Sequence, residues 1–223
     1  MSKNILIVGA SGLVGGEILK NLKTTNNDLI LLSRKKLLCE NSINQIVIDF
    51  ENIDSLDASL KVDEIYIAIG QKLSLSELVY IKKNNRKSFV NVDYNYIKKV
   101  AEFAKNCGAS SIGLISAIGA NTKSFNTYLK VKGDVEQEIK LVGYKKIIIA
   151  HPSHLLGKRA GEDIPMNVKV FEQITNLFGL LMIGPLQKFR NVEAKKVAKA
   201  IISKMDSVEE GIHYIDYKYF KNF

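Results

Sequence analysis

The chain has 223 residues, of which 46% are hydrophobic and 25% are charged, and its formal net charge is +9. This length suits one α/β domain, and no apolar run reaches the roughly 20 residues that a membrane-spanning helix needs. The basic residues are spread among acidic ones and accompany no recognised nucleic-acid motif, so we expect no nucleic-acid partner.

The first predicted element is the apolar strand 4–8, which runs into glycines spaced G-x-x-G-x-x-G. Gly9 allows a sharp turn, Gly12 lets the backbone approach a pyrophosphate, and Gly15 lets the following helix pack close to the strand. The N-terminus of that helix favours an anion. The pattern predicts a dinucleotide site, and the alternative is a glycine-rich turn without a ligand. Because the strand begins at Asn4, we expect no targeting peptide and a cytoplasmic protein.

The second predicted strand, 28–33, is followed by basic residues. Sites that prefer NAD usually place an acidic residue there for the ribose 2′-hydroxyl, but this chain has Arg34 and Lys35. Such cations suit a 2′-phosphate, which a guanidinium can hold by paired hydrogen bonds. We therefore predict NADP(H) as the cofactor, and the alternative is a solvated basic loop.

The third and fourth predicted strands, 45–48 and 64–70, also end in residues suited to a nucleotide. The third is followed by Asp49, which could accept the adenine amino group or cap the next turn, and by Phe50, which could cover the adenine ring. The fourth closes on Gly70, where the backbone can approach the central part of the cofactor.

Strand and helix patterns continue to alternate through the rest of the chain. We expect a loop with a short helix over 71–86, helices over 90–104 and 193–205, and strands over 111–116, 145–150 and 213–215. This alternation predicts a Rossmann fold, an α/β architecture with a doubly wound parallel sheet. We expect one domain over 1–223, with 152–190 as a small substrate-side lobe or lid.

Tyr128 and Lys132 are four residues apart on a predicted helix, so both side chains lie on one face. They follow the strand that ends at Ser116, which favours a catalytic set over a purely structural pair. In that interpretation Tyr128 donates a proton, and the ammonium of Lys132 lowers the phenol's pKa from about 10. Ser116 would polarise the substrate oxygen.

Other reactive side chains carry less information. His151 and His154 lie close together in sequence but lack a further ligand, and Cys39 and Cys107 have neither metal-ligand nor disulfide-framework spacing, so we expect no metal site. The apolar stretch 177–186 suggests a pocket wall, or a contact with a protein partner or second subunit.

Several stretches together resemble one family. They are GASGLVG at 9–15, Ser33–Lys35, Asp49–Phe50, YLKVKGDVE at 128–136 and P-x-x-L-x-G-x-R at 152–159. They are similar to the atypical short-chain dehydrogenase/reductases, most closely the Tat-interacting-protein-type oxidoreductases, and the glycine spacing is also typical of short-chain dehydrogenases.

The resemblance implies an NADPH-binding Rossmann protein. It implies pyrophosphate contacts from Ser11, Gly12, Leu13 and Val14, adenosine-phosphate contacts from Arg34 and Lys35, and further cofactor contacts from Ile69, Gly70, Tyr128, Lys132, Leu155 and Arg159. The turn that starts at Pro152 would lie where nicotinamide and substrate meet.

The chain departs from the family pattern at two positions. Ala117 replaces the second serine after the fifth strand, and His151 replaces the usual arginine before the proline, whereas Asn91 matches the helix asparagine of the wider superfamily. We therefore expect an NADPH-dependent oxidoreductase that transfers hydride to a small or apolar carbonyl substrate. The alternative is a non-catalytic NADPH-binding module that reports cofactor status to a protein partner.

Overall fold

A parallel sheet of seven strands, in the order β3-β2-β1-β4-β5-β6-β9, runs through the centre of the molecule. The structure, a computed structural model, describes residues 2–38, 43–157 and 184–223. The strands are β1 (Asn4–Val8), β2 (Asp28–Ser33), β3 (Asn44–Val47), β4 (Glu64–Ile67), β5 (Ser111–Ile115), β6 (Lys146–Ala150) and β9 (Gly211–Ile215). A separate two-stranded sheet pairs β7 (Leu155–Leu156) with β8 (Val192–Glu193).

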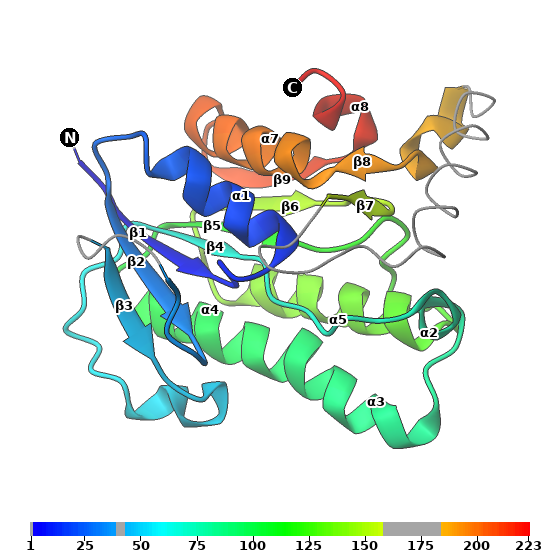
Figure 1. The fold of residues 1–223 in the computed structure, drawn as a ribbon, viewed down its shortest axis with the longest axis horizontal. Helices are drawn as coiled ribbons and strands as arrows, with labels where there is room; N and C mark the ends of the chain where they lie inside the picture. Colours follow the sequence, from blue (N-terminus) through cyan, green and yellow to red (C-terminus); the bar gives the residue numbers. More distant parts are fainter. Residues whose placement is uncertain (1, 39–42, 158–183) are drawn as a thin grey trace.

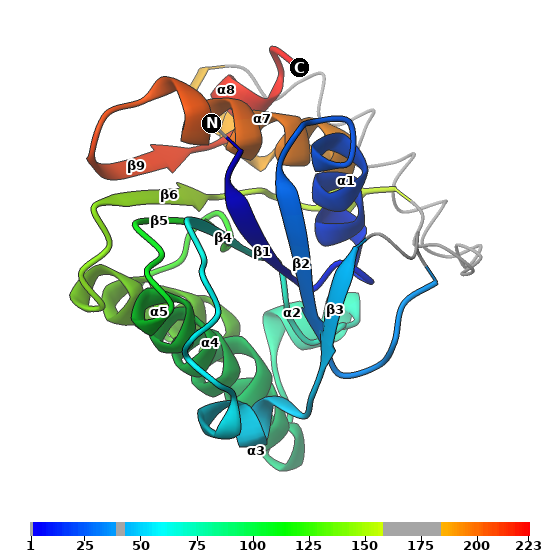
Figure 2. The ribbon, with the colours of Figure 1, turned by 90° about the vertical axis from the view of Figure 1, so that its left-hand side faces the viewer.

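Helices cover both faces of the sheet (Figures 1 and 2). One layer contains α1 (Leu13–Leu22), α7 (Ala194–Ser207) and α8 (Tyr217–Phe220), and the other contains α4 (Tyr96–Asn106) and α5 (Thr127–Leu141). The shorter helices are α2 (Leu75–Val79), α3 (Lys83–Val90) and two 3-10 helices, Phe50–Ser55 and Gly184–Phe189. The molecule is therefore a three-layer Rossmann fold, as the alternating pattern predicted.

Alternate residues of each central strand face opposite layers. In β1, Ile5 and Ile7 pack on the α1 and α7 side, whereas Leu6 and Val8 pack on the α4 and α5 side. A strand that is covered on both faces must be apolar throughout, which explains why the sequence shows continuous apolar runs rather than alternation.

Two differences from the sequence-based expectations concern elements near the carboxyl edge of the sheet. The helix expected over 90–104 is instead continuous with α3 through a π-helical turn, Asn91–Asn95, that leads into α4. The fourth strand ends at Ile67, because the chain leaves the sheet before Gly70. Most of the expected lobe 152–190 lies outside the described residues, as do Arg159 and most of the 177–186 stretch.

The order of the strands creates a switch point between β1 and β4, where successive connections run in opposite directions along the sheet. Ligands of doubly wound proteins bind at the carboxyl edge of the sheet at such a point. Strands β1 and β4 both end at this edge, where they are followed by Gly9 and Ala68.

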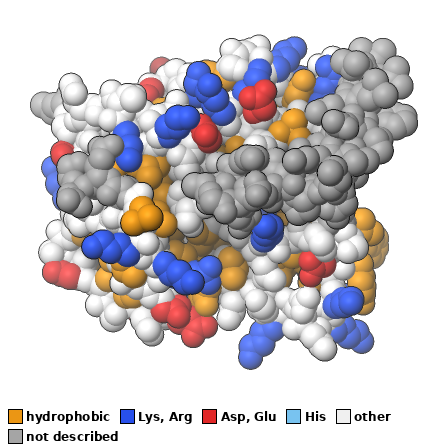
Figure 3. Space-filling view, in the orientation of Figure 1, with side chains coloured by type: hydrophobic (Ala, Val, Ile, Leu, Met, Phe, Trp, Pro, Cys, Tyr) orange, Lys and Arg blue, Asp and Glu red, His pale blue; other side chains and the backbone are white. Residues whose placement is uncertain are grey.

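The visible surface carries mixed charge. Figure 3 shows Lys and Arg side chains scattered over one face among acidic side chains rather than gathered in one patch. No helix within the described ranges is long and apolar enough to cross a membrane.

The glycines after β1 allow an unusually close contact between strand and helix. Gly9 has a φ of +95°, and a Cβ on Gly15 would lie 2.1 Å from the carbonyl oxygen of Gly9. Backbone atoms cannot yield as a flexible side chain can, so no larger residue fits at Gly15. The neighbouring Gly16 is less crowded, since its Cβ would lie 3.3 Å from the Ala10 carbonyl oxygen.

We predict that Gly15→Ala lowers the free energy of unfolding by about 1–3 kcal/mol, the usual cost of overpacking. The matched control is Gly16→Ala, which should change stability by less than about 1 kcal/mol, because the better helix propensity of alanine offsets its mild crowding. Urea unfolding measures both variants. Equal stabilities for the two variants would contradict the close contact at Gly15.

Candidate functional site

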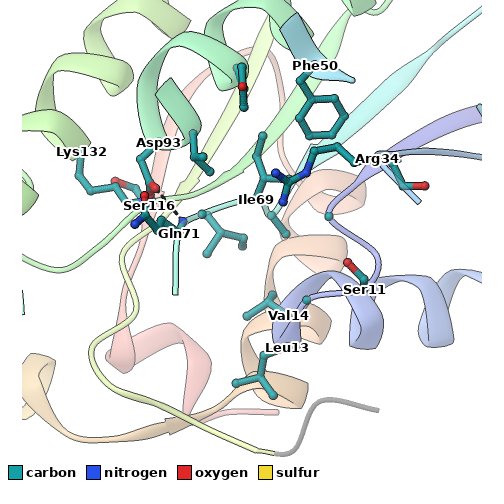
Figure 4. Close-up of a pocket in the computed structure, with 18 of the residues that line it drawn as sticks. Ser11, Leu13, Val14, Arg34, Phe50, Ile69, Gln71, Asp93, Ser116 and Lys132 are labelled. Carbon is teal, nitrogen blue, oxygen red and sulfur yellow. Dashed lines mark hydrogen bonds and ion pairs between the residues drawn. The ribbon is translucent and has the colours of Figure 1, made fainter. Parts of the chain in front are cut away.

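A cavity of about 330 Å³ lies at the switch point of the sheet. Figure 4 shows its labelled side chains, with Ser11, Leu13 and Val14 on one side and Asp93, Lys132 and Ser116 on the other. The residues that line it are Gly9, Ser11, Gly12, Leu13, Val14, Leu32, Ser33, Arg34, Phe50, Ala68, Ile69, Gly70, Gln71, Val92, Asp93, Tyr96, Ile115, Ser116, Tyr128, Lys132 and Leu155.

The N-terminus of α1 opens into this cavity without a side-chain cap. Gly12 is the N-cap residue, and the first turn of the helix carries no acidic side chain. The Gly12 N–H donates to the Gly9 carbonyl oxygen at 2.8 Å, which holds the turn. The first N–H groups of a helix have no partner within it, so this end of α1 can bind an anion. Gly15 itself packs behind the cavity rather than lining it.

Only one of the two predicted cations after β2 lines the cavity. The Ser33 hydroxyl donates to the Lys35 carbonyl oxygen at 2.7 Å, which shapes the turn. Both basic side chains are exposed, but Arg34 lines the cavity (Figure 4), whereas Lys35 is absent from the lining.

Of the two residues that follow β3 and were predicted to contact adenine, Asp49 and Phe50, only Phe50 lines the cavity. Phe50 lines the cavity and packs edge-on against Tyr96, with ring centroids 5.7 Å apart. The Asp49 carboxylate instead accepts the Glu51 N–H at 3.1 Å and caps the 3-10 helix. Of its two sequence-based interpretations, the structure shows the cap, and Asp49 is not among the lining residues.

At the opposite end of the cavity, Lys132 forms a buried ion pair that the sequence analysis did not predict. Its Nζ lies 2.8 Å from Oδ1 of Asp93, which stands on the π-helical turn before α4. The other carboxylate oxygen of Asp93 accepts the backbone N–H of Gln71 at 2.7 Å. Tyr128 lies one helical turn before Lys132, as expected, and its ring packs against Phe89 with centroids 5.9 Å apart.

These surroundings correct the expectation for Tyr128. Burial raises the pKa of the phenol, Lys132 lowers it, and Asp93 raises it again, so the net pKa lies above the usual value. Lys132 thus lowers the phenol pKa as expected, but burial outweighs it, so the expectation of a net pKa below the usual value is wrong. For Lys132, burial alone lowers the pKa, but Asp93, Tyr128 and Glu136 together raise it, so the side chain is a cation.

Ser116 lines the cavity but is already engaged in a hydrogen bond. Its hydroxyl donates to Oε1 of Glu136, and the His151 Nε2 lies 2.8 Å from the same oxygen. Glu136 is buried and stands one helical turn after Lys132 on α5. In this arrangement the Ser116 proton points to Glu136 rather than to a substrate, and Ala117 supplies no second hydroxyl.

The remaining predicted residues fall into three groups. Ile69, Gly70 and Leu155 line the cavity. Pro152 is buried, its carbonyl oxygen accepts the Ile118 N–H at 2.9 Å, and it is not among the lining residues. Arg159 lies outside the described residues.

Two other expectations concern residues away from the cavity lining. Asn91 accepts a hydrogen bond from Asn95 and does not line the cavity. Among the described residues, no group of His, Cys, Asp and Glu could hold a metal ion.

Two of the residues that were not predicted have a signal in the sequence. Asp93 is an acidic residue on the apolar helical face that also carries Val90 and Ile97, and such a position implies a buried partner. Glu136 continues the four-residue spacing of Tyr128 and Lys132, which places it on the same helical face. Neither signal identifies the partner, because each partner comes from a distant part of the chain.

Comparisons with known proteins identify relatives over most of the chain. HTATIP2 from Rattus norvegicus is 32% identical over 165 residues, which cover 71% of this chain and 65% of that protein. FMP52, mitochondrial, from Lodderomyces elongisporus is 30% identical over 176 residues, which cover 71% of this chain and 69% of that protein. The alignment with FMP52 from Candida albicans is 28% identical and covers 93% of this chain. No family model matches the sequence.

Solved structures share the fold. A short-chain dehydrogenase family protein from Francisella tularensis has a TM-score of 0.67 and 18% identity, covering 99% of this chain and 100% of that one. MoeE5, solved in complex with UDP-glucose and NAD, has a TM-score of 0.70 and 11% identity, covering 97% of this chain and 79% of that one. The similarity to these structures shows the fold, and the similarity in sequence to FMP52 and HTATIP2 shows that the chain belongs with them to the atypical short-chain dehydrogenase/reductases, a family of NAD(P)-binding, oxidoreductase-type proteins.

Proposed function

We propose that this protein is an NADPH-dependent oxidoreductase that reduces a carbonyl group. The observation that carries the proposal is that one cavity contains the uncapped end of α1, the Arg34 guanidinium and the Tyr128–Lys132 pair. Carbonyl reduction needs a dinucleotide site and a proton donor side by side, and these groups supply both.

The residues present suit a nicotinamide dinucleotide phosphate. The first turn of α1 would hold the pyrophosphate, and Gly12 keeps this cradle open, since a Cβ there would lie 3.1 Å from the Gly9 carbonyl oxygen. Arg34 would hold the 2′-phosphate and Phe50 would cover the adenine ring. Among the structural neighbours, MoeE5 is described with NAD, which supports this class of cofactor.

The chemistry divides between cofactor and protein. When bound, the nicotinamide supplies the hydride. Tyr128 would donate the proton to the carbonyl oxygen, and Lys132 would hold ribose hydroxyls with the N–H groups that Asp93 leaves free, because an ammonium has three donors. Since the pKa of Tyr128 is raised, the phenol stays protonated at neutral pH, and proton donation is lost as the pH rises through that pKa.

One observation favours the second candidate, a non-catalytic NADPH-binding module. The Ser116 proton is directed to Glu136, and Ala117 replaces the second serine, so a substrate oxygen would lack the usual serine donor. Tyr128 opposes this candidate, because a protein that only senses NADPH could use Lys132 for the ribose without needing a phenol in the cavity.

We predict that the protein binds NADPH more tightly than NADH, and that Arg34→Ala removes about 1.5–3 kcal/mol of the NADPH affinity, the scale of a charged hydrogen bond. The affinity of the Arg34→Ala variant for NADH should differ little from that of the parent. Lys35→Ala is the matched comparison and should have a smaller effect, since Lys35 does not line the cavity. Calorimetric titration measures all affinities, and equal affinity of the parent for both cofactors would contradict NADPH selectivity.

We predict that Tyr128→Phe lowers the rate of carbonyl reduction by about 10²–10⁴-fold, the usual contribution of a positioned acid. NADPH binding should stay nearly unchanged, because the ring and its packing remain. Tyr80→Phe, which alters an exposed tyrosine, is the control.

The measurement for Tyr128→Phe is NADPH oxidation with a panel of small and apolar aldehydes and ketones. A Phe variant as fast as the parent would exclude Tyr128 as the acid. If the parent binds NADPH tightly and reduces no carbonyl in the panel, the non-catalytic module becomes the function.

A further inference from the structure

Asp93 is the most deeply buried charged residue in the cavity. Its side chain is 2% exposed, and that of its partner Lys132 is 7% exposed. Both of its carboxylate oxygens have partners, the Lys132 ammonium at 2.8 Å and the Gln71 N–H at 2.7 Å. The carboxylate therefore connects three parts of the protein at one point: the chain after β4, the π-helical turn and α5.

The backbone is shaped to bring this carboxylate inward. Asp93 stands in the π-helical turn, and such turns are rare and frequently occur at functional sites. A Cβ on Gly70 would lie 3.2 Å from Oδ1 of Asp93, so a larger residue there would crowd the carboxylate.

The need to dock two helices does not explain this ion pair. The same two helical segments share a second pair, Lys98 with Glu138, which has an equal length of 2.8 Å but side chains that are 38% and 26% exposed. Burying two charges costs solvation that their attraction repays only in good geometry, and replacement by apolar residues is often neutral or stabilising. The position of Asp93 is thus better explained by its effect inside the cavity than by stability.

We propose that Asp93 is a positioning residue that holds the Lys132 side chain as a cation at a fixed place beside Tyr128. Its catalytic consequence rests on the proposed carbonyl reduction, whereas its electrostatic effect on the pair can be measured without cofactor or substrate.

The effect has a definite sign. Tyr128 and Lys132 together carry one positive charge when both are protonated, and the pair becomes neutral after the first proton leaves. The Asp93 carboxylate stabilises the cationic form, so it raises the pKa of that step whichever member loses the proton. The other described charged group that acts on the pair is Glu136, which acts on Lys132 from α5, while the neighbouring Phe89 ring carries no charge.

The test is a titration of Tyr128 in protein labelled with ¹³C-tyrosine, its signal assigned by its absence in Tyr128→Phe. Asp93→Asn keeps the shape of the side chain and removes its charge. We expect the midpoint of the Tyr128 titration to move to lower pH by about 1–3 units, the usual effect of a nearby charge. Glu138→Gln, which breaks the exposed pair of the same helices, should leave the midpoint in place.

The proposal is overturned if the Tyr128 midpoint is the same in Asp93→Asn as in the parent, or if Tyr128 titrates in neither protein while both stay folded. It is also overturned if Glu138→Gln shifts the midpoint as much as Asp93→Asn does. If Asp93→Asn does not fold, Asp93→Ser is measured instead, since it also removes the charge. In the enzymatic arm, the alkaline limb of the carbonyl reduction profile should move to lower pH in Asp93→Asn. A shifted titration without any carbonyl reduction would support the role of Asp93 and reject only the proposed function.

Discussion

The close contact between α1 and the end of β1 is the constraint on which the site depends. With a Cβ on Gly15 only 2.1 Å from the Gly9 carbonyl oxygen, strand and helix can meet this closely only through glycine. The contact places the uncapped N-terminus of α1 at the carboxyl edge of the sheet, next to the switch point between β1 and β4. The capacity of this end of the cavity to hold an anion follows from the backbone geometry rather than from a charged side chain.

The other end of the cavity is organised by buried polar contacts along α5. Lys132 is paired with Asp93, and Glu136 accepts from Ser116 and His151, so both side chains of this helical face are satisfied by partners from other elements. The two ends thus differ in kind. One offers unpaired backbone N–H groups to an anion, and the other holds a protonated phenol next to a charge that is already balanced.

Much of this could be predicted from the sequence, because the signals are local. Continuous apolar runs predicted the buried parallel strands, the glycine spacing predicted the turn before α1, and the spacing of Tyr128 and Lys132 predicted their shared helical face. Each inference depends on residues within a few positions of one another.

The rest depends on contacts between distant segments or on single-residue differences. Asp49 could equally cap a helix or meet adenine, and only the backbone after β3 decides for the cap. Arg34 and Lys35 look equivalent in sequence, yet the turn directs only Arg34 into the cavity. The sequence of the π-helical turn that carries Asp93 has no pattern that distinguishes it from an ordinary helix, so Asp93 could not be predicted as the partner of Lys132.

The most direct test of this account is a crystal structure of the protein with NADPH. We expect the pyrophosphate at the backbone N–H groups of Ser11, Leu13 and Val14, the 2′-phosphate at Arg34, and the nicotinamide ribose within hydrogen-bond distance of Lys132, with the Asp93 contact retained. A dinucleotide bound elsewhere, or no binding in solution or crystal, would contradict the account.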